Sequence, residues 1–123
     1  MNNKKRILVI DDNEDILEAI QDLLESEGYE VIINSKGDDT IEVTKTALPD
    51  LIILDLLLSG KDGGHICRDI KKDKKLEKIP VIMMSAHPNA KSLALDTGAD
   101  DFIPKPFDSK SLFLIIDKHL SRR

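Results

Sequence analysis

Short apolar runs alternate along this chain with longer stretches in which apolar residues recur at helical spacing. The apolar runs occupy residues 7–10, 31–33, 51–54, 81–84 and 102–103. A continuous run of aliphatic residues is typical of a strand covered on both faces, as in a parallel sheet. Four of the runs are followed by a stretch whose apolar residues recur at helical spacing, which predicts a helix. After residues 81–84, Leu93 and Leu95 mark a short predicted helix that ends near Gly98.

Polar residues, glycine and proline mark the ends of several predicted helices. Asn13 and Asp108 stand where N-caps of the first and last helices are expected, because their side chains can accept backbone N–H groups. Gly28 suits the position after the first helix, where a positive φ is common. Pro88 and Gly98 bound the fourth predicted helix. We therefore expect that helix to be short or irregular.

Five strand–helix units in one short chain predict an α/β fold with a doubly wound, largely parallel sheet. No linker or low-complexity tract divides the 123 residues. We predict a single domain over residues 1–123, structured over about residues 5–121.

Composition narrows the functional classes. Hydrophobic residues make up 41% of the chain, enough for a core without disulfides, and the net charge of −5 argues against a nucleic-acid-binding module. The single cysteine, Cys67, cannot form an internal disulfide and fits a reducing compartment. A membrane span needs about 18 apolar residues or more, and neither such a run nor a signal peptide is present. We expect a cytoplasmic protein that contacts neither membrane nor nucleic acid.

The notable polar residues fall at the carboxyl ends of the predicted strands. Asp11 and Asp12 follow the first strand, Asp55 ends the third, Ser85 ends the fourth, and Lys105 follows the fifth. In a doubly wound sheet, ligands bind at these strand ends, near the point where the strand order reverses. The five placements agree, and they predict one site built from all five residues.

Three carboxylates in one pocket repel one another, by about 1 kcal/mol per pair at 4 Å even in water. A hard divalent cation such as Mg²⁺ would compensate, because it prefers oxygen ligands. Lys105 adds a positive charge that can pair with Asp55 or with a phosphoryl oxygen. Metal and lysine together suit phosphoryl transfer, and an aspartate can itself be the nucleophile that becomes an aspartyl phosphate.

These features together resemble the receiver domain of two-component response regulators over almost the whole chain. The motifs that carry the resemblance are residues 7–12 with the paired acids, 49–55, Asp62-Gly63, 84–86 and 98–107. The resemblance implies a flavodoxin-like (βα)5 fold with strand order 2-1-3-4-5. It also implies that Asp55 accepts the phosphoryl group and that Asp11 and Asp12 organise Mg²⁺.

Further roles follow from the same resemblance. Asp55 and the backbone carbonyl of Leu57 would complete the metal site. Ser85 would hydrogen-bond the phosphoryl group, and Phe102 would change rotamer as the switch aromatic, unless it is fixed in the core. The Lys105–Pro106 peptide would be cis.

The resemblance also implies the partners. The phosphoryl donor would be a phosphohistidine on a sensor histidine kinase or a histidine phosphotransfer protein. The domain would signal through its fourth helix, fifth strand and fifth helix, and it would not be an enzyme in its own right beyond transfer to and loss of phosphate from Asp55. A homodimer formed on phosphorylation fits this reading. The downstream target and any attached effector domain are not encoded in these motifs.

Three other functions stay open from the residues. A phosphohydrolase of the haloacid dehalogenase type would want a second aspartate where Leu57 stands, and a nucleotide-binding module would want a phosphate-binding loop after the first strand. A receiver that no longer takes phosphate would act by interaction alone.

The segment at residues 85–98 is shorter than the family usually shows. Cys67 is expected in the core, and His119 at the surface or in packing.

Overall fold

The computed structural model describes residues 4–36, 39–58, 61–87 and 89–120. Ser121, the last residue of the predicted structured range, lies outside them. In chain order the elements are β1 (Arg6–Ile10), α1 (Glu14–Ser26), β2 (Glu30–Asn34), α2 (Thr40–Ala47), β3 (Leu51–Asp55), β4 (Leu57–Leu58), β5 (Lys61–Asp62), α3 (Gly63–Lys72), β6 (Val81–Ser85), α4 (Ala90–Asp96), β7 (Asp101–Pro104) and α5 (Ser109–His119).

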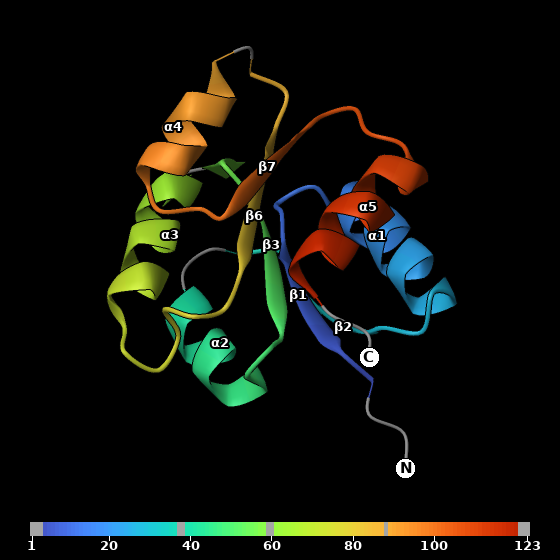
Figure 1. Cartoon of the computed structure of the whole chain (residues 1–123), viewed down its shortest axis with the longest axis horizontal. Coiled ribbons are helices and arrows are strands. Elements are labelled where there is room, and N and C mark those ends of the chain that lie inside the picture. The colour runs from blue at the N-terminus through green and yellow to red at the C-terminus, as the bar shows by residue number, and fades with distance from the viewer. Residues whose placement is uncertain (1–3, 37–38, 59–60, 88, 121–123) are drawn as a thin grey trace.

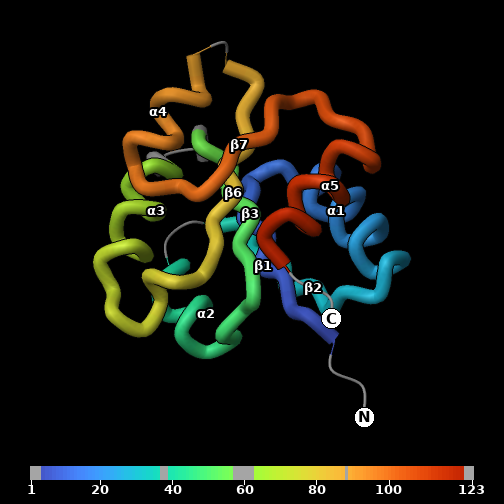
Figure 2. The backbone as a smooth tube through the Cα atoms, viewed as in Figure 1, coloured from blue at the N-terminus to red at the C-terminus, as the bar shows by residue number. Residues whose placement is uncertain are grey.

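A five-stranded parallel sheet forms the middle layer of the molecule. Its strand order is β2-β1-β3-β6-β7, which confirms the predicted flavodoxin-like order 2-1-3-4-5. Helices α1 and α5 cover one face, and α2, α3 and α4 cover the other (Figures 1 and 2). The short strands β4 and β5 form a separate antiparallel pair, which the sequence pattern did not predict. Among the described residues, none of the helices is long and apolar enough to cross a bilayer.

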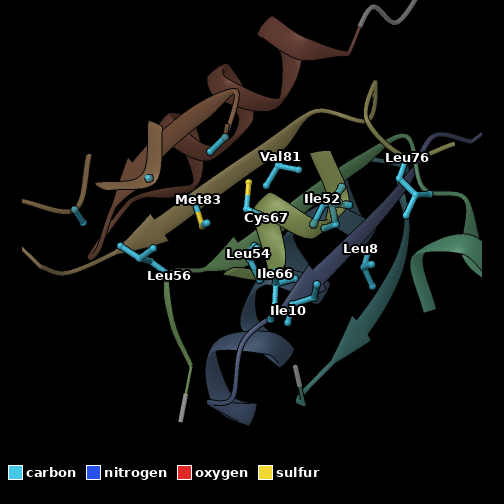
Figure 3. Close-up of a cluster of buried hydrophobic side chains, with 14 residues drawn as sticks. Leu8, Ile10, Ile52, Leu54, Leu56, Ile66, Cys67, Leu76, Val81 and Met83 are labelled. Carbon is cyan, nitrogen blue, oxygen red and sulfur yellow. The ribbon is translucent and has the colours of Figure 1, made fainter. Parts of the chain in front are cut away.

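Each face of the sheet has its own hydrophobic core, because alternate residues of a strand point to opposite faces. Figure 3 shows the core under α3 and α4, where Leu54 and Met83 pack with Ile66 and Cys67. Cys67 is fully buried, as predicted, and burial raises the pKa of its thiol. A buried, protonated thiol of this kind is unreactive, so Cys67 is a packing residue.

The helix ends confirm several predictions. The Asn13 side chain accepts the Ile16 N–H at 3.1 Å, and the Asp108 side chain accepts the Ser111 N–H at 2.7 Å. Gly28 follows α1 with a φ of +92°. Helix α4 has 7 residues, about two turns, so it is short as expected. Pro88 itself lies outside the described residues.

Candidate phosphoacceptor site

The register of the sheet brings the predicted site residues together at one end of it, where the strands have their carboxyl ends. Asp55 is the last residue of β3 and pairs with Met84 of β6, and Ser85 at the end of β6 pairs with Pro104 of β7. Asp11 directly follows β1, whose last residue pairs with β3 one position before Asp55. Parallel strands in near register end together, which is why residues so far apart in sequence meet here.

Asp11, Asp12 and Asp55 form an acidic cluster that could hold a metal ion. One carboxylate oxygen from each lies within 4.8 Å of the others. Asp11 is fully buried and Asp55 is 6% exposed. Such an arrangement is costly unless a cation compensates it, and an all-oxygen donor set fits Mg²⁺. Leu57, the fourth predicted ligand, follows in β4 two residues after Asp55.

Lys105 reaches into the same cluster. Its Nζ atom lies 2.9 Å from Asp11 Oδ2 and 3.6 Å from Asp55 Oδ2. The pairing with Asp55 was predicted, whereas the shorter contact with Asp11 was not. The Lys105–Pro106 peptide is cis, as expected, and the Lys105 N–H donates to the Ser85 carbonyl at 2.9 Å. One lysine thus neutralises part of the charge of two buried carboxylates.

Ser85 is 2% exposed at the end of β6. Its Oγ accepts the backbone N–H of His87 at 3.1 Å, and a hydroxyl that accepts one bond can still donate another. Asp55 lies on the neighbouring strand, one register step before Ser85. The hydroxyl therefore belongs to the same end of the sheet as the cluster.

Phe102 lies half-buried in β7 and packs against the core beneath α3 and α4.

Asp101, which precedes Phe102, contacts two residues of α5. Its Oδ2 atom lies 2.9 Å from His119 Nε2 and 3.3 Å from Lys118 Nζ. Burial alone would raise the pKa of Asp101. The hydrogen bonds from His119, from the Phe102 N–H and from Lys118 outweigh burial and hold the pKa below its usual value. The sequence pattern gave no signal for this contact between α5 and β7.

Gly63, at the start of α3, packs closely against the end of β3. Its N–H donates to the Leu56 carbonyl at 2.8 Å, and a Cβ atom placed on it would lie 2.1 Å from the Asp55 carbonyl oxygen. Only glycine allows so close an approach between α3 and the end of β3. The Asp62-Gly63 pair was one of the motifs singled out in the sequence, and this close approach is the physical reason for its glycine.

An apolar groove of about 450 Å³ borders the site between α1 and the segment after β7. Lys105 forms part of its wall, so the groove opens next to the acidic cluster. Its lining residues are Ile16, Ala19, Ile20, Leu23, Ala86, Lys105, Pro106 and Phe107.

Comparison with known proteins agrees with the motifs. The family model of the response regulator receiver domain matches residues 7–117. The receiver domain of NtrX from Brucella abortus is 34% identical, with a TM-score of 0.85 over 95% of this chain and 99% of that one. The signal receiver domain of a signal transduction histidine kinase from Syntrophus aciditrophicus is 31% identical, with a TM-score of 0.86 over 97% and 94%. A two-component response regulator from Clostridium difficile is 26% identical, with a TM-score of 0.87 over 97% and 98%.

Proposed function

This chain belongs to the response regulator receiver domain family, and on that premise we propose that it is a signalling switch phosphorylated on Asp55. Receiver domains are signalling domains of two-component systems rather than enzymes in the usual sense, and they bind Mg²⁺ at an acidic pocket. The observation that carries the proposal is the acidic group of buried Asp11, buried Asp55 and the more exposed Asp12, with Lys105 between the two buried carboxylates.

The site residues have distinct tasks in the transfer. An Asp55 carboxylate oxygen attacks the phosphorus of a phosphohistidine, the P–N bond breaks, and its electron pair stays on the imidazole of the donor. Asp11, Asp12, Asp55 and the Leu57 carbonyl would hold Mg²⁺, which supplies charge neutralisation for the transferred group. Lys105 supplies a second positive charge, and moves from the carboxylates to a phosphoryl oxygen.

Ser85 and Phe102 change position when Asp55 is phosphorylated. The new dianion on Asp55 attracts the Ser85 hydroxyl, which donates a hydrogen bond to it and draws in the segment after β6. That movement vacates space into which Phe102 turns. The surface of α4, β7 and α5 changes as a result, and a downstream partner or a second copy of the chain binds the changed surface.

The donor is a sensor histidine kinase or a histidine phosphotransfer protein, and it docks on the groove beside α1. A phosphohistidine must come within bonding distance of Asp55, so the donor has to cover the surface next to the cluster. The groove with Ala19 at its wall is apolar and shares Lys105 with the site. Apolar surface of this kind drives association when a partner buries it.

Phosphorylation is tested with a small donor. The protein is incubated with acetyl phosphate and Mg²⁺, and its intact mass is measured. We expect a gain of one phosphoryl group that is lost in Asp55→Asn and with EDTA, but kept in Asp69→Asn, a matched change at an exposed position of α3. If neither acetyl phosphate nor a histidine kinase produces the gain, the domain works by interaction alone.

Docking is tested separately with Ala19→Arg. We expect this variant to accept phosphate from acetyl phosphate at the normal rate, but from a phosphorylated phosphotransfer protein at least about tenfold more slowly, because the arginine fills the apolar groove. Ser26→Arg, at the exposed end of α1, is the control and transfers normally. Equal slowing by both donors would place the defect in the site and not in docking.

A further inference from the structure

Strand β2 forms one edge of the sheet and pairs with β1 on one side. The Glu30 N–H donates to the Lys5 carbonyl at 2.9 Å, and the Asn34 carbonyl accepts the Asp11 N–H at 3.2 Å. The even-numbered residues of β2 therefore turn their backbone groups toward β1.

Backbone groups alternate in direction along a strand, so those of the odd-numbered residues point the other way. The N–H and C=O groups of Val31 and Ile33 face outward from the sheet edge. Ile33 is also 43% exposed, although it is a large apolar residue. An edge of this kind is a template for one more strand.

A groove lies on each side of β2. The groove toward α1 has a volume of about 430 Å³ and includes Ile33 and Leu17. The groove toward α2 has a volume of about 470 Å³ and includes Ile32 and Val43. An added strand would place its side chains alternately over the two sheet faces, and hence alternately over the two grooves.

Both grooves are acidic. Glu14 and Glu18 line the one toward α1, and Asp39 and Glu42 line the one toward α2. Among the lining residues that the structure describes, neither groove contains lysine or arginine. The two grooves thus offer apolar floors with negative rims on both sides of a row of backbone groups that pairs with no other strand within the described ranges.

We propose that the β2 edge binds an extended, basic segment of a partner protein by strand addition. Backbone hydrogen bonds to Val31 and Ile33 hold the segment, apolar side chains fill the grooves, and Lys or Arg side chains meet the acidic rims. A second copy of this chain is a poor occupant, because two acidic edges brought together would repel. This surface lies on the sheet edge formed by β2, away from the α4, β7 and α5 surface of the proposed switch.

The probe is the hexapeptide VVKKVV, labelled with fluorescein, which presents Val, Lys and Val to each groove in an extended conformation. We expect it to raise fluorescence anisotropy, and VVEEVV to leave it unchanged. In ¹H–¹⁵N spectra of the full chain, the peptide should shift the amides of Val31 and Ile33 most. Shifts confined to α4 or α5, or equal binding of VVEEVV, would overturn the proposal.

Variants separate the backbone contacts from the charges. Ile33→Pro removes an outward N–H without removing a bond to β1, and should weaken VVKKVV about five- to tenfold relative to Ile33→Ala. Glu18→Gln combined with Glu42→Gln should weaken it about threefold or more, with the loss vanishing at high salt. Equal affinity of Ile33→Pro and Ile33→Ala would contradict strand addition. Concentration-dependent dimerisation blocked by Ile33→Pro would make a second copy the occupant instead.

Discussion

The proposed phosphoacceptor site and the surface of α4, β7 and α5 depart from the usual distribution of side chains in opposite directions. In the site, polar groups are buried, with Asp11 at 0% and Asp55 at 6% exposure. On α4 and α5, large apolar residues are exposed, with Leu93 at 51% and Leu114 at 65%. Buried charge and exposed apolar surface are each informative, because folding alone favours neither.

The two departures differ in what they cost the folded protein. A buried carboxylate costs several kcal/mol unless it is paired, so Asp11 depends on its ion pair with Lys105 for its place in the fold. An exposed leucine hardly changes the stability of the fold, and it gains free energy when a partner buries it. Changes at the site should therefore alter stability and chemistry together, whereas changes at the surface should alter partner binding alone.

Among changes at the site, the largest effect on stability is expected from Gly63→Ala. The added Cβ would overlap the Asp55 carbonyl oxygen, which lies 2.1 Å from its position, so β3 and α3 must move apart. We expect the free energy of unfolding to fall by about 3 kcal/mol, measured by urea denaturation, with slower phosphorylation of Asp55.

Gly28→Ala is the matched control, because its Cβ would meet nothing within 4 Å. It bears only the strain of a φ of +92°, about 1–2 kcal/mol. Gly63 has no positive φ, so its substitution tests the close approach alone. If Gly63→Ala lost no more stability than Gly28→Ala, a small shift would relieve the contact with Asp55, and the site would be less tightly packed than we infer.

The next effect concerns the metal. Mg²⁺ at about ten times its dissociation constant should stabilise the protein by about 1.4 kcal/mol. Asp12→Asn removes one charge from the cluster, so it should reduce this gain and stabilise the metal-free protein by about 1 kcal/mol through relief of repulsion. Thermal unfolding with and without Mg²⁺ at constant ionic strength measures both.

An exposed carboxylate outside the cluster serves as the control for Mg²⁺. Asp69→Asn, on α3, should leave the gain from Mg²⁺ unchanged. If Mg²⁺ stabilised the Asp12→Asn variant as much as it stabilises the wild type, Asp12 would not hold the ion.

The fold and the strand-end placement of the site could be read from the sequence for a physical reason. Continuous apolar runs identify buried parallel strands, and parallel strands end together, so Asp11, Asp55 and Ser85 had to meet. The short α4 followed from the residues that bound it. The site was therefore predictable at the level of which residues lie at which end of the sheet.

Contacts that depend on side-chain reach were not predictable. The pattern placed Lys105 near the cluster but did not reveal that it lies closer to Asp11 than to Asp55. It did not pair His119 with Asp101, because both lie at the ends of separate elements whose distance only the packed structure sets. The β4 and β5 pair was missed since two-residue strands carry no periodicity.

A smaller effect is expected from His119→Ala. The loss of its hydrogen bond to Asp101 should cost about 0.5–1 kcal/mol at pH 7, because this bond joins α5 to β7. The folded pKa of Asp101 lies below its usual value, so the stability it contributes is present above about pH 3.8 and is lost as the pH falls through the folded pKa. The difference between wild type and variant should therefore shrink only in strong acid, as urea titrations at several pH values would show.

Lys118→Ala is the control for that prediction. Its Nζ atom lies 3.3 Å from the same carboxylate, but its side chain is 69% exposed, so its loss should cost less than about 0.5 kcal/mol. A larger loss for Lys118 than for His119 would show that charge, and not the partly buried hydrogen bond, ties α5 to β7.

The smallest effect on stability is expected from serine substitution of the exposed leucines of α4 and α5. Leu93→Ser and Leu114→Ser should change the free energy of unfolding by no more than about 0.5 kcal/mol, whereas Leu112→Ala, at a fully buried position of α5, should cost about 3 kcal/mol. Sedimentation of each variant before and after acetyl phosphate treatment gives the functional reading. If phosphorylation of Asp55 drives self-association through this surface, the wild type and a control such as Lys110→Ser dimerise when phosphorylated and both leucine variants stay monomeric. If all of them dimerise equally, the exposed leucines are not the binding surface. In that case the buried acidic site carries function in this chain, but the exposed leucines of α4 and α5 do not.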